Sequence, residues 1–400
     1  MKKFKLPYLF IIFIICALLK GGVFAGAGSS FQRQAGLQEA ASQEAALEQV
    51  ALEQVALRQE KVKLIGRTKL ENGTLWLTQS ASGIEFTTDA SFVRFEAVGN
   101  DEYLRVNPVR FAIWVNGERI ADRLLSKESM VVEVPTARGK SVSTVRILKL
   151  SEAFGGFMGI RNLQISSGSY AKPTQQKKLR IEFIGDSITC GYGVDDENPE
   201  HGFSTATEDA TKTYAYKTAQ ALDADYSMVC YSSCGIASGY TSDGSRAEDY
   251  LVPDFYEQYA HVDGSEGYFT PDTLWDFSRF TPDIVVINLG TNDFSYTGDD
   301  EERRGQFRYQ YYQFLLTVRA HYPEAQIICS LGMMGDALYR DVEDVVSWFA
   351  WDPGDEKISA FHFSVQDGSL GFAAGYHPTE GTHAKAAREL TAFIRQTFHE

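Results

Sequence analysis

The sequence predicts two folded domains in tandem. An all-β sandwich of jelly-roll type is expected over residues 61–170, followed by an α/β domain with a doubly wound, flavodoxin-like parallel sheet over residues 181–400. The first region contains short alternating apolar runs separated by tight turns, which is typical of a sandwich. In the second region, apolar runs alternate with helical segments, which is typical of a parallel sheet covered by helices on both faces. A chain of 400 residues has room for both domains and for additional segments.

The sandwich is predicted from six strand-like runs, at residues 75–78, 84–87, 93–97, 111–115, 131–134 and 145–148. Turn sequences separate them, among them Glu71-Asn72-Gly73 and Asn116-Gly117-Glu118. Residues 171–180 are polar and basic, and we expect them to be a linker.

The α/β domain is predicted from four strands, at residues 179–184, 227–231, 284–289 and 326–331. Helices are expected at residues 214–222, 308–321 and 382–398. The third strand is almost purely apolar, as a central parallel strand buried on both faces should be. In such sheets a ligand binds beyond the carboxyl ends of the strands.

The start of the chain is predicted to be an export signal. Lysines at positions 2, 3 and 5 precede an apolar run over residues 6–19, and Val23 and Ala25 are small residues suited to cleavage after residue 25. An uncleaved membrane anchor is the alternative, but the apolar run is short for a full span. We therefore expect residues 1–25 to be removed, leaving no membrane segment in a protein that is released or held at the cell surface.

Residues 26–60 are predicted to be a low-complexity helical spacer. Residues 46–50 are copied at once by residues 51–55, and most of the segment is Ala, Leu, Glu and Gln, which are good helix formers.

Composition limits the possible partners. The formal net charge is −15, which argues against nucleic acid as a ligand because phosphates require a basic surface. Aromatic residues make up 13% of the chain; they suit either sugar-binding surfaces or a sandwich core. Four cysteines remain after the export signal, too few for a disulfide scaffold. Cys190 and Cys234 either form a bridge or stay as buried free thiols, and we favour the thiols.

Three predicted strands end in polar sequences that suit acyl transfer. The first leads into Gly185-Asp186-Ser187, the second into Cys234-Gly235 and the third into Thr291-Asn292-Asp293, while His377 precedes the last helix. A serine hydroxyl attacks a carbonyl after an imidazole takes its proton. Backbone and amide N–H groups stabilise the oxyanion that forms.

These blocks resemble the SGNH (GDSL) hydrolase superfamily. The resemblance implies that Ser187 is the nucleophile and His377 the base. It further implies that the oxyanion is held by the N–H groups of Ser187 and Gly235 and the side-chain amide of Asn292. Asp186 and Asp293 match positions that support the loops.

The predicted sandwich segment points to one family within this superfamily. Runs such as Asn72-Gly73-Thr74-Leu75-Trp76-Leu77, placed before Gly-Asp-Ser-Ile-Thr-Cys-Gly-Tyr-Gly, are similar to carbohydrate esterase family 2, the acetylxylan-type esterases. That resemblance implies hydrolysis of O-acetyl esters on xylan or glucomannan. The implied partner is an acetylated polysaccharide or oligosaccharide, with no metal and no organic cofactor.

One departure from the family pattern concerns the acidic partner of the histidine. Ala374 and Gly375 stand where relatives carry Asp. We expect a backbone carbonyl to accept the Nδ1 proton in a Ser–His dyad, with Asp367 or Glu380 as alternatives. Activity is expected to fall below about pH 6, because His377 must be neutral to act as a base.

Four aromatic residues near the motifs are candidates for contact with substrate, although simple packing explains each of them equally well. They are Tyr376, Trp275, Tyr192 and Phe294. A metal site at His377 and His383 is rejected, because their spacing does not place two ligands on one helix face.

Other function classes remain open at this stage. The same fold hosts lipases, thioesterases and peptidoglycan O-acetyl esterases, because a fold does not fix the substrate. A non-catalytic carbohydrate-binding protein is the alternative outside enzymes, and the missing acid is its only support.

Overall fold

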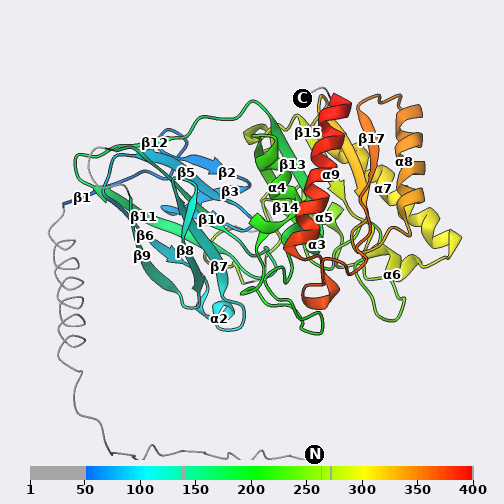
Figure 1. The fold of residues 1–400 in the computed structure, drawn as a ribbon, viewed down its shortest axis with the longest axis horizontal. Coiled ribbons are helices and arrows are strands. Elements are labelled where there is room, and N and C mark those ends of the chain that lie inside the picture. The colour runs from blue at the N-terminus through cyan, green and yellow to red at the C-terminus, as the bar shows by residue number, and fades with distance from the viewer. Residues whose placement is uncertain (1–50, 137–140, 263, 271–272, 399–400) are drawn as a thin grey trace, which may run out of the picture. The chain divides into compact units, whose positions relative to one another are not determined.

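The computed structural model describes residues 51–136, 141–262, 264–270 and 273–398. Residues 52–400 form one compact unit, which holds a β-sandwich followed by a parallel sheet with helices (Figure 1). Both predicted fold classes are therefore confirmed. The predicted signal peptide at residues 1–25 lies outside the described residues.

The sandwich consists of two antiparallel sheets, each built on a path of five strands with one short strand beside it. In spatial order, the first sheet is β3 (Thr68–Glu71), β4 (Thr74–Leu77), β11 (Met158–Ser166), β6 (Phe92–Val98) and β9 (Ser129–Pro135), with β1 (Leu52–Gln54) on β11. The second is β12 (Ala171–Pro173), β5 (Gly83–Thr88), β10 (Ser143–Lys149), β7 (Val109–Val115) and β8 (Glu118–Leu125), with β2 (Lys63–Ile65) on β5. A short helix, α2 (Asp101–Leu104), follows β6.

Two predictions at the ends of the sandwich are wrong. Residues 52–54 form strand β1 and not the end of a helical spacer, because they pair with Gln164–Ser166 of β11. Sheet pairing there overrides the helix propensity of Leu, Glu and Gln. Residues 26–50 of the predicted spacer lie outside the described residues. In the predicted linker, Ala171–Pro173 forms β12 and pairs with β5, so the connection to the next domain begins after residue 173.

The α/β domain has a parallel five-stranded sheet. Its order is β14 (Asp225–Cys230), β13 (Arg180–Gly185), β15 (Ile284–Asn288), β16 (Gln326–Leu331) and β17 (Ile358–His362). The order 2-1-3-4-5 is the flavodoxin-like order that the sequence predicted. Strand β17 was not predicted; it is a partly exposed edge strand without the apolar character of the other four.

Helices cover both faces of this sheet. Alternate residues of β15 explain the arrangement: Ile284 and Val286 pack in one core with α4 (Tyr214–Ala221) and α9 (Glu380–Phe398). Val285 and Ile287 pack in the other core, with α7 (Glu301–His321) and α8 (Tyr339–Trp351). The remaining elements are short: α3 (Ser187–Cys190), α5 (Val252–Tyr256), α6 (Asp293–Thr297) and the 3-10 turns Ala210–Lys212, Phe277–Arg279 and Ala374–Tyr376.

The two domains share their cores. Trp76 and Phe157 of the sandwich belong to the same apolar cluster as β15 and α7. Ala112 and Leu148 join the cluster on the opposite face. No helix within the described ranges combines the length and the apolar character needed to cross a bilayer.

Candidate active site

The candidate site lies at the carboxyl ends of three adjacent strands. Ser187 follows β13, Gly235 follows β14 and Asn292 follows β15, and these strands are neighbours in the sheet. The parallel arrangement therefore brings together three blocks that are separated along the sequence. His377 reaches the same place from the turn before α9.

The segment that carries Ser187 is a single helical turn. The Asp186 carboxylate caps helix α3 by accepting the Ile188 N–H at 3.0 Å, and Gly191 ends the helix in the left-handed conformation at φ 88°. Ser187 is the first residue of this helix, so its N–H has no acceptor inside the helix. The geometry leaves that N–H available for an anionic atom in front of Ser187.

Ser187 and His377 are hydrogen bonded. Nε2 of His377 lies 2.8 Å from Oγ of Ser187, and Nδ1 lies 3.1 Å from the Ala374 carbonyl and 3.2 Å from that of Gly375. Because the carbonyls can only accept, Nδ1 carries the proton and Nε2 accepts from the serine hydroxyl. The structure thus has the backbone arrangement that the sequence analysis favoured.

The two alternative acids lie in other interactions. Asp367 is exposed and accepts the Ser369 N–H at 2.9 Å. Glu380 pairs with Lys217 at 2.7 Å. Neither carboxylate contacts Nδ1 of His377, whose two acceptors are both main-chain oxygens.

Tyr192 packs against the imidazole. The two rings are stacked with centroids 4.0 Å apart and an interplanar angle of 16°, and the ring of Phe203 packs against Tyr192 with centroids 5.2 Å apart. Burial lowers the pKa of His377 to about 4, although the Ala374 and Gly375 carbonyls favour the charged form. The imidazole is therefore neutral at pH 7 and able to accept a proton.

Gly235 does not present its N–H as the sequence predicted. That N–H donates to the Tyr250 carbonyl at 3.1 Å, and Val252 donates back to the Gly235 carbonyl at 2.9 Å. The prediction of Gly235 as an oxyanion donor is therefore wrong in this conformation. Lack of space explains why this position holds a glycine: a Cβ on residue 235 would lie 2.0 Å from the Ser238 carbonyl oxygen and 2.6 Å from Oδ2 of Asp293.

Asn292 lies beside the same segment. Its Nδ2 donates to the Cys234 carbonyl at 2.8 Å and, through a longer contact of 3.4 Å, to Oδ2 of Asp186. The second contact is near the outer limit of a hydrogen bond, so one amide hydrogen is only weakly engaged.

The two aspartates of the motifs hold loops, as the resemblance implied. Oδ1 of Asp293 accepts three consecutive backbone N–H groups, from Ile236, Ala237 and Ser238, at 2.7–3.0 Å. Burial raises the pKa of Asp186 to about 7 and that of Asp293 to about 6.

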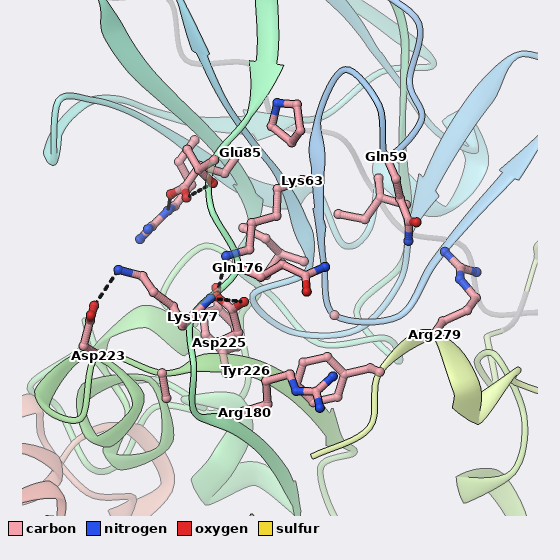
Figure 2. A pocket seen from close by; sticks show the side chains of 18 of the residues that line it. Gln59, Lys63, Glu85, Gln176, Lys177, Arg180, Asp223, Asp225, Tyr226 and Arg279 are labelled. Atoms are coloured by element: carbon pink, nitrogen blue, oxygen red, sulfur yellow. Dashed lines mark hydrogen bonds and ion pairs between the residues drawn. The ribbon is translucent and has the colours of Figure 1, made fainter. Parts of the chain in front are cut away.

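The four aromatic candidates separate into two groups. Tyr192 contacts His377, and Tyr376 and Phe294 are partly exposed next to His377 and Asn292 in the chain. Trp275 is wrong as an active-site residue, because it lines a cleft of about 230 Å³ at the amino ends of the strands. Figure 2 shows Arg180 and Asp225, which begin β13 and β14, in the lining of this cleft. Trp275 is also largely buried, because its ring packs against the guanidinium groups of Arg67 and Arg279.

Two exposed aromatic residues beside the Gly235 segment were missed by sequence reasoning. Tyr240 donates its N–H to the Ser233 carbonyl at 2.8 Å, and Tyr250 accepts from Gly235. Both rings are largely solvent accessible. Their position depends on a bridge between Gly235 and Leu251, which no local sequence pattern reveals.

The cysteines and the second histidine are structural. Cys190, Cys230, Cys234 and Cys329 are buried free thiols, as we favoured. Nδ1 of His383 accepts the Tyr214 N–H at 3.2 Å in the core.

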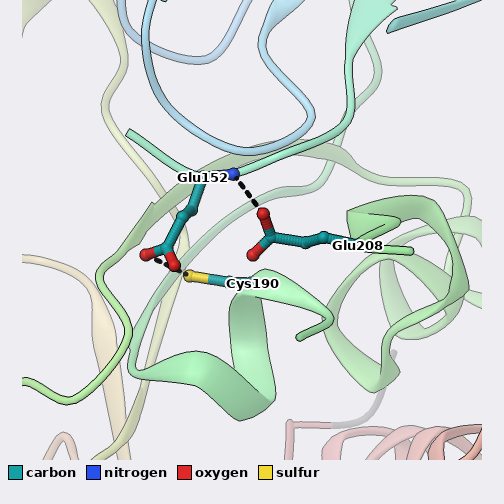
Figure 3. A group of neighbouring side chains, drawn as sticks. All are labelled: Glu152, Cys190 and Glu208. Carbon is teal, nitrogen blue, oxygen red and sulfur yellow. Dashed lines mark hydrogen bonds between the residues drawn. The ribbon is translucent and has the colours of Figure 1, made fainter. Parts of the chain in front are cut away.

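One buried cluster of side chains contains the carboxylate and thiol groups that commonly bind metal ions. Atoms of Glu152, Cys190 and Glu208 lie within 4.8 Å of one another and are fully buried (Figure 3). The buried ammonium of Lys149 lies beside them: its Nζ donates to the Glu152 carbonyl at 2.8 Å, and its charge acts on both carboxylates. A positive charge is thus already built into the group, which does not favour a divalent cation.

Comparison with known proteins places these features in a family. A model described as the GDSL-like Lipase/Acylhydrolase family matches residues 183–385, which include Ser187, Gly235, Asn292 and His377. Cellulase/esterase CelE of Acetivibrio thermocellus is 31% identical over 289 residues, covering 71% of this chain. The chain spans only 34% of the length of CelE.

Two further matches cover most of the chain. An acetylxylan esterase / glucomannan deacetylase of Cellvibrio japonicus is 26% identical over 272 residues, covering 68% of this chain and 72% of that protein. The structure of a family two carbohydrate esterase from Clostridium thermocellum, in complex with cellohexaose, superimposes with a TM-score of 0.74 at 27% identity. That match covers 84% of this chain and 99% of the other, so it includes the sandwich as well as the parallel sheet.

Proposed function

The chain belongs to the GDSL-like lipase/acylhydrolase family, close to carbohydrate esterase family 2, and on that premise we propose that it is a secreted serine esterase that hydrolyses O-acetyl esters on plant-type polysaccharides such as xylan and glucomannan. The observation that carries the proposal is the 2.8 Å contact between Nε2 of His377 and Oγ of Ser187. In this contact a neutral imidazole can accept the proton of the Ser187 hydroxyl. The contact lies at the carboxyl ends of the parallel strands, where ligands bind in sheets of this type.

In the acylation step, Nε2 of His377 takes the proton of Ser187 while Oγ attacks the acetyl carbonyl carbon. The tetrahedral intermediate collapses when the imidazolium gives this proton to the leaving sugar oxygen. Acetyl is then held as an ester on Oγ. In the second step, water gives a proton to His377 and attacks this ester. The imidazolium returns the proton to Oγ, and acetate is released.

Two donors are assigned to the oxyanion. The Ser187 N–H is one, and the Asn292 amide hydrogen that makes the 3.4 Å contact with Asp186 is the other. A donor of this kind is typically worth ~3 kcal/mol in the transition state. Gly235 is left out, because its N–H is bonded to Tyr250.

Two main-chain oxygens take the place of the missing acid. The carbonyls of Ala374 and Gly375 fix the tautomer of His377, and their dipoles favour the imidazolium that forms in each step. Their partial charges are smaller than that of a carboxylate, and the stacked Tyr192 adds a π-face against the same cation.

Other observations support the proposed polysaccharide substrate and the proposed export of the protein. The relatives include an acetylxylan esterase / glucomannan deacetylase. Tyr376 precedes His377 and Phe294 follows Asn292 by two residues, while Tyr240 and Tyr250 make backbone hydrogen bonds with the Ser233–Gly235 segment; all four are exposed. Flat exposed rings suit the C–H face of a pyranose. The basic and apolar start of the sequence supports export through a signal that is removed.

Acetate release from acetylated xylan and acetylated glucomannan tests the proposal. Wild type and the surface control Ser369→Ala should release acetate, and Ser187→Ala should release none. Release by wild type that persists in Ser187→Ala would refute the assigned nucleophile. Esters of 4-nitrophenol with acetate, butyrate and octanoate test the acyl group; a preference for octanoate would favour a lipase instead.

A further inference from the structure

A buried group of charged side chains joins the sandwich to the nucleophile helix. Glu152 lies in the loop after β10 of the sandwich, and Glu208 and Cys190 belong to the α/β domain (Figure 3). Both glutamates and Lys149 are at most 1% exposed. Burying charged groups in this way is costly unless each is tightly paired, so the group calls for an explanation.

The Glu152 carboxylate contacts both segments that form the candidate site. Its Oε2 accepts the Ser232 N–H at 2.6 Å and the Cys190 thiol at 3.6 Å. Cys190 is the last residue of the helix that begins with Ser187, and Ser232 opens the segment that leads to Gly235. A single carboxylate oxygen of Glu152, in the sandwich, thus binds both the Ser187 helix and the Ser232 segment of the α/β domain.

Lys149 and Glu208 hold Glu152 in turn. Glu208 accepts the Glu152 N–H at 2.9 Å, and Lys149 donates to the carbonyls of Ser151 and Glu152. The second oxygen of Glu208 is buried with no hydrogen-bond partner among the described residues. Burial raises the pKa of both glutamates, and the charge of Glu152 raises that of Glu208 further.

We propose that Glu152 is a positioning residue for the esterase reaction, through which the sandwich fixes the Ser187 helix and the Ser232–Gly235 segment in the reactive geometry. The sandwich is then part of the catalytic apparatus and not an attached binding module. The inference rests on the proposed function, since it concerns the same serine.

The test compares Glu152→Gln with a matched control, Glu182→Gln. Glu182 on β13 is, like Glu152, fully buried next to a basic side chain, in this case Arg67. One of its carboxylate oxygens accepts the Tyr256 hydroxyl at 2.8 Å, and the other has no hydrogen-bond partner in the described part of the chain. Its contacts do not reach the candidate site. Both variants should lose thermal stability, but only Glu152→Gln should lose activity.

For 4-nitrophenyl acetate, kcat of Glu152→Gln should fall about 10- to 100-fold with KM within about twofold, as expected when reacting groups are misplaced but the pocket remains. The rate at which a fluorophosphonate labels Ser187 should fall in parallel. Values of kcat within twofold of wild type, at temperatures where the variant is folded, would overturn the proposal. Equal loss of kcat in Glu182→Gln would also overturn it, because general destabilisation would then be the cause.

A second pair of variants covers the case in which Glu152→Gln does not fold. Cys190→Ser keeps a donor for Glu152 and should keep kcat, whereas Cys190→Val removes the donor and should lower it. If Cys190→Val equals wild type, the positioning role is refuted. If wild type neither cleaves any ester nor labels at Ser187, the proposed function fails instead.

Discussion

The ring of Tyr192 lies flat on the imidazole of His377, with centroids 4.0 Å apart and planes 16° from parallel. With no carboxylate on Nδ1, this stacking and two carbonyl oxygens are what orient the imidazole that we propose as the catalytic base. An aromatic face also stabilises a cation above it by about 0.5–2 kcal/mol. The stack should therefore matter most when the imidazole is protonated in the transition state.

Replacing Tyr192 tests this directly. We expect Tyr192→Ala to lower kcat for 4-nitrophenyl acetate about 10-fold, from the loss of both orientation and cation–π stabilisation. Tyr192→Phe keeps the ring and serves as the matched control, with kcat near that of wild type. A similar loss in both variants would show that the hydroxyl group, and not the ring face, is what matters.

The burial of His377 sets the acid limit of activity. The sequence predicted a loss below about pH 6, but burial lowers the pKa of His377 to about 4. Because the base must be neutral, and burial disfavours its charged form, kcat/KM of the free enzyme should stay level down to about pH 5 and fall near pH 4. A pH profile of kcat/KM with a stable acetate ester measures this. A midpoint near 6.5 would mean that the imidazole is solvated as in a free peptide.

His383 should contribute to acid sensitivity of the fold. It is buried, accepts the Tyr214 N–H, and burial lowers its pKa to about 3. The unfolded chain binds a proton at this residue below about pH 6.5 and the folded chain does not, so stability from His383 decreases as the pH falls from about 6.5 to 3. Over that window the cost is about 1.4 kcal/mol per pH unit.

Thermal melts of wild type and His383→Asn isolate this effect. The amide oxygen of Asn can accept the Tyr214 N–H but does not titrate, so the Tm of the variant should depend less on pH below 6.5. Other groups, such as Asp186 and Asp293, contribute equally to both proteins and cancel in the difference. Parallel Tm curves for the two proteins between pH 7 and pH 4 would contradict the assignment.

Gly235 is expected to be required for space and not for its N–H. A Cβ there would lie 2.0 Å from the Ser238 carbonyl and would displace the loop that Asp293 holds. We expect Gly235→Ala to lower the free energy of unfolding by about 1–3 kcal/mol and to remove most of the activity. Gly202→Ala is the control, because no atom lies within 4 Å of its added Cβ. Wild-type stability of Gly235→Ala in a urea titration would refute the steric argument.

Local patterns predicted four of the five parallel strands and the segments that carry Ser187 and His377, because each block is continuous in sequence and joins a strand end or a helix start. Strand β1 was missed since its composition favours a helix and only its partner β11 makes it a strand. Trp275 was assigned to the wrong edge of the sheet because nearness to a motif in sequence does not give the side chain's place in space.

The remaining differences arise from long-range contacts. The bond from Gly235 to Tyr250 spans a loop, and Glu152 reaches the Ser187 helix from another domain. Neither Tyr250 nor Glu152 lies in a local motif, so no pattern within one segment could predict the residues that they contact.

Restoring the missing acid at position 375 is expected to fail. Gly375 has φ 60°, a backbone conformation that side chains disfavour, and an added Cβ would lie 3.2 Å from both Nδ1 of His377 and Cε1 of Tyr192. Gly375→Asp should therefore push the imidazole off the tyrosine ring and lower kcat about 10-fold or more, instead of raising it. Gly371→Asp is the matched control: its φ is 75°, but the only neighbour within 4 Å of the added Cβ is Cγ2 of Thr379, at 3.7 Å. Both variants should lose some stability from the strained backbone, so a loss of kcat confined to Gly375→Asp would assign the effect to His377. A higher kcat in Gly375→Asp than in wild type would show that the two carbonyl acceptors limit the rate.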